Sequence, residues 1–370
     1  MGTSATGRGH GWPPVFFRRV SHSRPAIRGG RKIILTPTPP FPFPIHRRRK
    51  RGGCCNLAAL VMKSPLTGIV PPMITPLLQR DRLDVAGLER LIEHILAGGV
   101  SGLFILGTSG EGPSLGYALR RELIQRTCRL VRARVPVLVG ITDTIFDESV
   151  NMAKAAADAG AAAVVLAPPY YLHAAQPELL EYLDHLVPEL PLPLYLYNMP
   201  AVTKVAFEIE TLRRAMDYPG IIGLKDSSCN MFYFHQVLAL LPQRPDWPLL
   251  IGPEELLFDA VLAGGHGGVN GGANVFPRLY VRLFEAARAG DVTRARQLHG
   301  AIMRVSGSLY RIGRHSSAII KGIKGALSCL GICADGMAEP FSRFREEERK
   351  VVQARLAELQ VDLGQLDLQP

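Results

Sequence analysis

The hydrophobic residues of this chain form short runs that alternate with longer amphipathic stretches. The alternation begins at residue 68 and repeats roughly every 25–30 residues. Each run is apolar at successive positions, which is typical of parallel strands buried on both faces. The runs predict strands at Gly68–Ile74, Gly102–Leu106, Val135–Val139, Ala163–Leu166, Leu192–Tyr197, Ile221–Leu224, Leu249–Ile251 and Gly267–Asn270.

An amphipathic pattern after each run predicts a helix. In residues 85–96, for example, Leu88, Leu91, Ile92 and Ile95 follow the three- and four-residue spacing of one helix face. The other seven helices are expected at Tyr117–Arg132, Asp147–Ala159, Pro177–Leu186, Glu208–Ala215, Met231–Leu241, Glu254–Ala263 and Pro277–Ala287.

Eight strand–helix units predict an α/β fold, a (β/α)₈ TIM barrel, over residues 63–290. A doubly wound open sheet is the alternative, but no Gly-x-Gly-x-x-Gly motif follows the first strand. Residues 291–370 contain helical patterns without strands, and we expect them to form a C-terminal helical extension. These helices are predicted at Val292–Ser306, Ser316–Leu330 and Arg345–Leu359.

The net charge of +11 comes from the N-terminal segment. Residues 1–62 hold twelve of the 43 Lys and Arg residues and no Asp or Glu, so the rest of the chain is close to neutral. This segment is rich in Pro and Gly, and we interpret it as a disordered basic tail. A targeting segment, a nucleic-acid-binding or anionic-surface-binding patch at Arg47 to Arg51, and a true start at Met62 remain open. We expect no nucleic-acid partner for the folded body.

The cysteines and the hydropathy narrow the class of protein further. The six cysteines show no metal-ligand spacing, which fits a reducing compartment, and we expect a cytoplasmic protein. No run reaches the roughly 18–20 apolar residues that span a bilayer, so no membrane partner is expected.

Two reactive side chains end consecutive predicted strands. Lys225 follows the run Ile221–Leu224, where a charged amine is costly unless it is used. Tyr197 ends the preceding strand, and neighbouring strands lie about 4.8 Å apart. Because catalytic groups of a barrel lie at the carboxyl ends of its strands, the amine and the phenol are candidates for an imine-forming site. An ion-paired structural lysine is the alternative.

Two further motifs fall at the same end of the predicted barrel. Gly107-Thr108-Ser109-Gly110-Glu111-Gly112 follows the second strand, and its small residues let N–H groups and hydroxyls approach an anion. An ordinary Gly-rich turn is the alternative. Glu111 is a candidate for orienting this turn, although its partner is not evident. Tyr170 and Tyr171 follow the fourth strand.

Four motifs carry a family resemblance: Gly107-Thr108-Ser109-Gly110-Glu111, Tyr170-Tyr171, Tyr197-Asn198-Met199-Pro200 and Gly223-Leu224-Lys225-Asp226-Ser227. In this order and spacing they resemble the dihydrodipicolinate synthase/N-acetylneuraminate lyase family of Schiff-base class I aldolases. The resemblance covers roughly residues 66–345. It implies that Lys225 forms an imine with pyruvate or another 2-oxo acid, which requires the neutral amine. Tyr197 would carry the proton of the aldehyde oxygen, and Thr108 would link it into a hydroxyl relay.

The resemblance also implies substrate contacts and an assembly. Ser109 would hold the 2-oxo acid carboxylate, with Ser227 and Val269 as further substrate-binding residues. Tyr171 would reach across a subunit interface in the synthase branch, and the assembly would be a homotetramer. No metal or organic cofactor is implied.

Two departures and one match bear on which branch of the family this chain resembles. The synthases carry an arginine for the aldehyde's carboxylate where this chain has Val202, which cannot make that contact. Glu254 and Glu255 match an acidic pair that binds sugar hydroxyls in sialic acid lyases. Acidic residues in a first helical turn also have a purely structural explanation. Gly271 replaces a substrate-binding serine of those lyases.

We therefore expect an aldolase or lyase that reversibly cleaves a 2-keto-3-deoxy sugar acid or a sialic-acid-like substrate. A dihydrodipicolinate synthase that condenses pyruvate with an aldehyde is the first alternative. A non-catalytic barrel that binds a sugar acid is the alternative from another class.

Overall fold

The computed structural model describes residues 65–313 and 315–366 of the 370-residue chain. All described residues belong to one compact unit. The predicted tail, residues 1–62, lies outside the described residues. Within the described part, no helix is long and apolar enough to cross a membrane.

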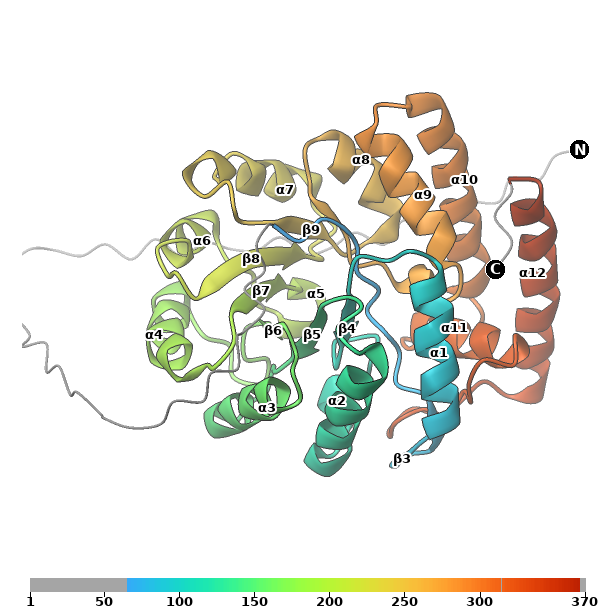
Figure 1. Ribbon diagram of the computed structural model, residues 1–370, viewed down its shortest axis with the longest axis horizontal. Coiled ribbons are helices and arrows are strands. Elements are labelled where there is room, and N and C mark those ends of the chain that lie inside the picture. Colours follow the sequence, from blue (N-terminus) through green and yellow to red (C-terminus); the bar gives the residue numbers. More distant parts are fainter. Residues whose placement is uncertain (1–64, 314, 367–370) are drawn as a thin grey trace, which may run out of the picture. The chain divides into compact units, whose positions relative to one another are not determined.

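Eight parallel strands form the centre of the fold (Figure 1). This confirms the (β/α)₈ barrel that the sequence predicts. The sheet order is β1-β10-β9-β8-β7-β6-β5-β4, and a bridge between Pro72 and Phe104 closes the ring. The strands are β1 (Gly68–Ile69), β4 (Leu103–Ile105), β5 (Val137–Gly140), β6 (Ala163–Leu166), β7 (Leu194–Asn198), β8 (Ile221–Asp226), β9 (Leu249–Ile251) and β10 (Gly267–Gly268).

Helices surround the strands in chain order (Figure 1). They are α1 (Val85–Ala97), α2 (Tyr117–Val131), α3 (Phe146–Asp158), α4 (Gln176–Leu186), α6 (Ile209–Ala215), α7 (Met231–Leu238), α8 (Leu257–Leu262) and α9 (Pro277–Arg288). A short helix, α5 (Pro200–Thr203), follows β7. Single 3-10 turns occur at η1 (Gly112–Ser114), η2 (Val187–Glu189), η3 (Leu241–Gln243), η4 (Glu254–Leu256) and η5 (Gly271–Asn274).

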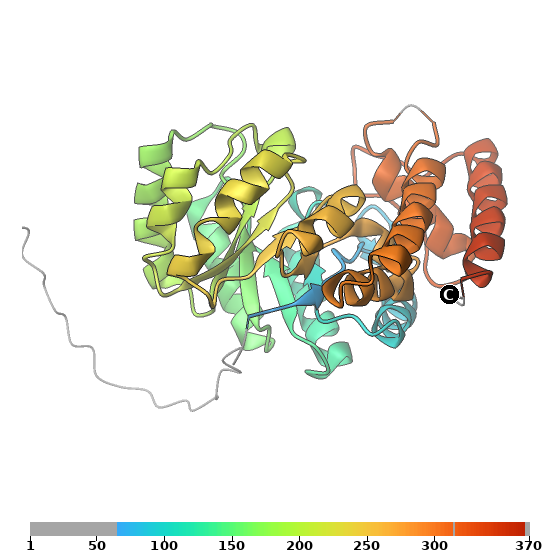
Figure 2. The same ribbon diagram turned by 90° about the horizontal axis from the view of Figure 1, so that it is seen from above.

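Three helices follow the barrel, as the sequence predicts. They are α10 (Val292–Leu309), α11 (Ala318–Cys329) and α12 (Glu346–Gly364). Helix α10 packs along α9, and α12 packs on both α10 and α11. Figure 2 shows these three helices grouped at one side of the barrel.

Several element boundaries differ from the predictions for local reasons. The first strand ends at Ile69 rather than Ile74, because Pro71 and Pro72 have no N–H to continue a ladder. The hairpin of β2 (Leu77–Gln79) and β3 (Arg82–Leu83) was not predicted, since only Leu77 and Leu83 in it are buried. The sixth barrel strand runs two residues further than predicted, through Lys225 and Asp226.

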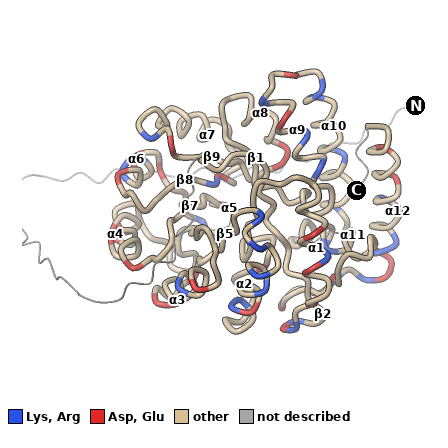
Figure 3. The backbone as a smooth tube through the Cα atoms, in the orientation of Figure 1, with Lys and Arg blue, Asp and Glu red and all other residues tan. Residues whose placement is uncertain are grey.

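The barrel interior is apolar and separate from the layer between strands and helices. It contains Leu66, Val70, Phe104, Leu138, Ala163, Val165, Ala167, Tyr195, Tyr197, Leu250 and Val269. Charged residues lie mainly on the surrounding helices (Figure 3). Among the eight barrel strands, only β8 carries Lys, Arg, Asp or Glu, namely Lys225 and Asp226. The barrel therefore concentrates its strand charges at the carboxyl end of one strand.

The Tyr195 ring occupies barrel space that only a glycine at position 223 leaves free. A Cβ atom at Gly223 would lie 2.4 Å from Tyr195 Cε1 and 2.9 Å from the Pro248 carbonyl oxygen. We therefore expect Gly223→Ala to lower the free energy of unfolding by about 1–3 kcal/mol, measured by urea denaturation.

Gly116→Ala is the matched control, because a Cβ there meets nothing within 4 Å and the backbone is extended. Its free energy of unfolding should stay within about 0.5 kcal/mol of wild type. Equal stability of both variants would contradict the packing described here.

Candidate active site

Lys225 and Tyr197 lie side by side at the carboxyl ends of β8 and β7. The two residues are register partners in the sheet. This confirms the prediction that they end neighbouring strands. The Lys225 Nζ atom lies 4.1 Å from the centroid of the Tyr197 ring and 5.0 Å from that of Phe104. The two rings meet edge to face. The amine is thus surrounded by aromatic faces, which attract a cation but do not accept a proton.

Burial controls the ionisation of this lysine. Lys225 is only 6% exposed, and loss of hydration lowers its pKa below the usual value for an amine. The neighbouring Tyr197 acts in the opposite direction but is the smaller influence. No carboxylate lies within salt-bridge distance of Lys225 in the described part of the chain. The amine is therefore placed to be neutral at a lower pH than a free lysine.

Tyr197 is linked to the turn after β4 through Thr108. The Thr108 Oγ1 and Tyr197 hydroxyl oxygens are 3.2 Å apart, within hydrogen-bond distance. Thr108 is exposed, Tyr197 is buried, and the contact joins elements 89 residues apart in sequence. A chain of groups thus runs from the Lys225 amine through the Tyr197 phenol to an exposed hydroxyl.

The turn that carries Thr108 has unusual backbone geometry at both ends. Leu106 and Glu111 have φ angles of 59° and 56°, a left-handed conformation that costs a non-glycine residue about 1–2 kcal/mol. Gly107 fits closely against the barrel, since a Cβ there would lie 2.5 Å from Phe104 Cε1. Such strain is typical of sites where surrounding contacts fix a functional backbone.

Two polar residues on the outer side of β7 and β8 hold the reactive strand ends in register. Asn198 Nδ2 donates to Asp226 Oδ1 at 2.9 Å, and the Ser228 N–H and hydroxyl also donate to the Asp226 carboxylate. The Phe207 N–H donates to Asn198 Oδ1. The sequence motifs contain these residues, but sequence reasoning gave them no role. Their hydrogen bonds hold the ends of β7 and β8 together on the strand face opposite Lys225 and Tyr197.

The remaining expected site residues divide into buried and exposed ones. Ser227 and Val269 are buried at the ends of β8 and β10, whereas Ser109 is half-buried next to Thr108. Tyr171 and Val202 are exposed, by 82% and 51%. The structure thus brings Lys225, Tyr197 and Thr108 into contact and leaves Tyr171 on the surface.

Glu254 has partners that the sequence did not predict. It is 4% exposed, and its carboxylate accepts hydrogen bonds from the Gly272 N–H at 2.8 Å, the Tyr310 hydroxyl at 2.9 Å and the Tyr280 hydroxyl. Burial raises the pKa of Glu254 to about 7 despite these donors. Its oxygens are therefore engaged within the protein, by η5, α9 and the residue that follows α10. The sequence left open both a contact with sugar hydroxyls and a structural role for this residue. Glu255 is half-buried.

With this geometry in place, comparison with known proteins identifies the family. Residues 65–359 match the dihydrodipicolinate synthetase family. The chain belongs to this family. Its relatives are lyases and aldolases, so this protein is an enzyme of that class.

Relatives with different activities resemble the chain. A solved dihydrodipicolinate synthase from Bacteroides thetaiotaomicron is 54% identical over 80% of this chain and all of its own, with a TM-score of 0.79. A 4-hydroxy-tetrahydrodipicolinate synthase of Ralstonia nicotianae is 31% identical, covering 79% of this chain and 97% of its own. A putative 2-dehydro-3-deoxy-D-gluconate aldolase of Escherichia coli is 30% identical, covering 82% and 97%. Family membership therefore does not decide the substrate.

Sequence reasoning about this family member missed Lys324. This residue of α11 has no exposed side-chain surface and forms an ion pair with Glu111. No clear signal marked it, because Lys324 lies at the edge of the apolar face of the predicted helix Ser316–Leu330, one turn after Lys321. Phe104 was missed as a neighbour of Lys225, since a phenylalanine inside an apolar strand carries no distinguishing pattern.

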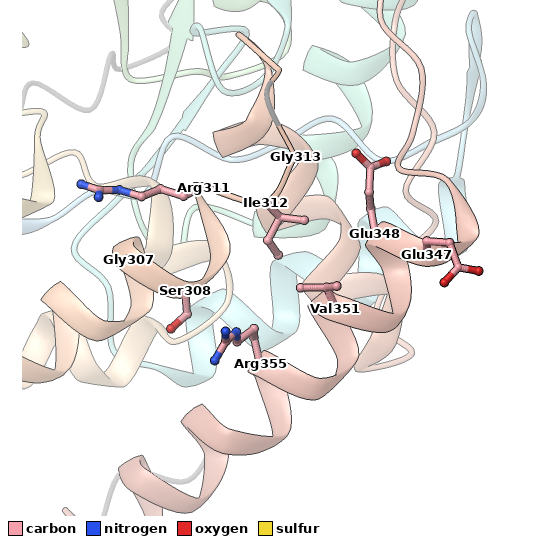
Figure 4. Close-up of a pocket in the computed structure, with 9 residues that line it drawn as sticks. All are labelled: Gly307, Ser308, Arg311, Ile312, Gly313, Glu347, Glu348, Val351 and Arg355. Carbon is pink, nitrogen blue, oxygen red and sulfur yellow. The ribbon is translucent and has the colours of Figure 1, made fainter. Parts of the chain in front are cut away.

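A surface cavity of about 540 Å³ lies away from these residues, between the end of α10 and the first half of α12 (Figure 4). It is lined by Gly307, Ser308, Arg311, Ile312, Gly313, Glu347, Glu348, Val351 and Arg355. None of the expected site residues lines it. In residues 65–313 and 315–366, no cluster of three His, Cys, Asp or Glu side chains could hold a metal ion.

The buried amine predicts a pH-dependent cost to stability. Because the pKa of Lys225 is lower in the folded chain than in the unfolded one, the unfolded chain binds the proton more tightly. The loss of folding free energy from burying this charge is largest below the pKa that Lys225 has in the folded chain. It disappears as the pH rises to the pKa of lysine in the unfolded chain, about 10.4. We expect Lys225→Met to unfold at higher urea concentration than wild type at pH 7, with a smaller difference at pH 9.5.

The exposed Lys154 on α3 supplies the control. Lys154→Met should change the unfolding midpoint little at either pH. A Lys225→Met variant that is less stable than wild type at pH 7 would contradict the uncompensated burial of this amine.

Proposed function

We propose that this enzyme is a Schiff-base aldolase that reversibly cleaves a 2-keto-3-deoxy sugar acid into pyruvate and an aldehyde. The observation that carries the proposal is the contact of a buried lysine amine, uncompensated by a nearby carboxylate, with a tyrosine whose hydroxyl meets Thr108. Imine chemistry needs a neutral amine, and this environment favours one.

In the proposed reaction, the neutral Lys225 amine adds to the keto carbon of the substrate. The Tyr197 hydroxyl protonates the oxygen that leaves as water, giving a protonated imine and a Tyr197 phenolate. The Tyr197 oxygen takes the proton of the C4 hydroxyl as the C3–C4 bond breaks. The bonding electrons move to the imine nitrogen, forming an enamine, and the aldehyde departs. Tyr197 then gives the proton to the enamine carbon, and water hydrolyses the resulting imine with its proton passing to Tyr197, which releases pyruvate and restores the amine.

The other site residues have roles in this proposal that rest on the family resemblance. Thr108 connects the Tyr197 hydroxyl to the outside, and the half-buried Ser109 beside it binds the substrate carboxylate. Ser227 and Val269 border the reacting carbon from the neighbouring strand ends. The exposed Tyr171, followed by the exposed Leu172, supports an interface in a homotetramer. The cytoplasmic location and the absence of a cofactor remain predictions.

The choice of sugar acid rests on Val202. This side chain lies on α5, directly after the strand that ends at Tyr197 and Asn198, and it is half exposed. It supplies no cation for a second carboxylate on the aldehyde, whereas a hydroxylated aldehyde needs none. The internal hydrogen bonds of Glu254 weigh against a sialic-acid-like substrate, leaving Glu255 as the acidic residue available for hydroxyls.

The dihydrodipicolinate synthase activity is the second candidate. It is favoured by the 54% identity to the Bacteroides thetaiotaomicron protein of that name. In that reaction the same enamine of pyruvate would attack an aldehyde that bears a carboxylate. The two candidates share Lys225 and Tyr197 and differ only in the aldehyde.

A substrate panel separates the two candidates. We expect pyruvate release from 2-keto-3-deoxy sugar acids to exceed condensation of pyruvate with aspartate semialdehyde by at least tenfold in kcat/KM, measured with a coupled pyruvate assay and by product mass. Val202→Arg should shift this ratio toward condensation, because it adds the missing carboxylate partner. The reverse preference in the wild type would establish the synthase activity instead.

The proton-transfer role of Tyr197 gives a second prediction. Tyr197→Phe keeps the ring against Lys225 but removes the hydroxyl, so kcat for cleavage should fall about 10²–10⁴-fold. Tyr195→Phe is the matched control on the same strand, because the buried Tyr195 hydroxyl has no hydrogen-bond partner among the described residues. That control should retain kcat within about twofold. Equal losses in both variants would show a packing effect rather than proton transfer.

A further inference from the structure

A buried ion pair connects the C-terminal helices to the turn that carries Thr108. The Lys324 ammonium group on α11 contacts the Glu111 carboxylate and donates a hydrogen bond to the Gly336 carbonyl oxygen at 2.6 Å. Glu111 also accepts a hydrogen bond from the Ala338 N–H at 2.8 Å. The carboxylate is thus held by two segments that lie more than 200 residues further along the chain.

The backbone around Glu111 transmits this contact to Thr108. The Glu111 N–H donates to the Thr108 carbonyl oxygen at 3.1 Å, and the Gly112 N–H donates to the Gly107 carbonyl oxygen at 3.2 Å. From the other side, Thr75 Oγ1 donates to the Gly110 carbonyl oxygen at 2.7 Å. Because these bonds close a tight turn, a shift of Glu111 must also move Thr108.

Two features of this turn require an external support. Glu111 has a φ of 56°, which a non-glycine residue retains only when its surroundings hold it. The hydroxyls of Thr108 and Tyr197 are 3.2 Å apart, so a displacement of 1 Å would break their hydrogen bond. The relay therefore depends on the position of a strained turn.

Stability alone does not explain the ion pair. Removing two charges from water costs about as much as their attraction returns, so apolar residues of similar volume would hold the two layers together equally well. Lys324 is 0% exposed and cannot touch a substrate. Its contact with Glu111 connects it to the turn that carries Thr108.

We propose that Lys324 is a positioning residue: by holding the Glu111 carboxylate from α11, it keeps Thr108 within hydrogen-bond distance of the Tyr197 hydroxyl. This inference rests on the proposed function, since it concerns the proton relay of that reaction. Helix α11 then positions a catalytic group, although it lies outside the barrel.

The test uses full-length protein and pyruvate as the probe, and it separates two events at the site. Borohydride trapping measures imine formation by Lys225. Exchange of the pyruvate methyl protons in D₂O, followed by NMR, measures proton transfer. The Tyr197 oxygen takes a methyl proton from the imine to give the enamine, exchanges it with solvent through the Thr108 hydroxyl, and returns a deuteron to the carbon. We expect Lys324→Met to lower the exchange rate at least tenfold while the trapped adduct at saturating pyruvate stays within twofold of wild type.

A double-mutant cycle shows whether the loss passes through Thr108. Thr108→Val should lower exchange to a similar extent, and adding Lys324→Met to it should cause less than a threefold further loss. Glu111→Gln, which retains an acceptor oxygen for Lys324 and Ala338, should lose less than threefold. Glu111→Ala breaks the contact from the turn side and replaces Lys324→Met in the cycle if the latter does not fold.

Arg349→Met is the control for general destabilisation. Arg349 forms an ion pair with Asp335 in the same C-terminal segment but does not contact Glu111. It should lower the melting temperature while leaving exchange within twofold. A folded Lys324→Met variant with exchange within twofold of wild type would overturn the inference, as would additive losses in the cycle or an equal exchange loss in Arg349→Met. A wild-type protein that traps no adduct would instead refute the proposed function itself.

Discussion

The burial of one amine is the constraint on which the rest of the site depends. Lys225 lies against the Tyr197 and Phe104 rings and, among the described residues, has no nearby carboxylate that would stabilise its protonated form. A barrel can place it there because adjacent parallel strands end at the same rim. The register of β7 and β8, fixed by the Asn198–Asp226 hydrogen bond, sets the amine against the phenol. The resulting low pKa is a cost to folding and a requirement for imine chemistry.

The C-terminal helices contribute to the same site from outside the barrel. Helix α11 supplies Lys324 to Glu111, and the residue after α10, Tyr310, binds Glu254. Two acidic residues of the rim are therefore anchored by side chains from beyond the eighth strand–helix unit. Both carboxylates are nearly inaccessible to solvent. The strained turn after β4 and the η5 turn after β10 are thereby fixed to a layer that the barrel fold alone does not require.

The sequence predicted the barrel and the pairing of Lys225 with Tyr197, because apolar runs and strand ends are local patterns. It did not reveal the partners of Glu111 and Glu254. Lys324 lies 213 positions from Glu111 and Tyr310 lies 56 positions from Glu254, and a lysine within a helical pattern is normally placed on the exposed face. The acidic pair also showed why motif transfer is limited: Glu254 occupies the expected position but is engaged by two tyrosines.

The central claim is that the Lys225 amine forms a covalent imine with a 2-oxo acid. The most direct measurement is reduction with borohydride in the presence of pyruvate, followed by mass spectrometry of the peptides. The account predicts one reduced pyruvyl adduct, located on Lys225 and absent from Lys225→Met. A folded protein that acquires no adduct, or acquires it on another lysine, would contradict the claim and favour a non-catalytic binding role for the barrel.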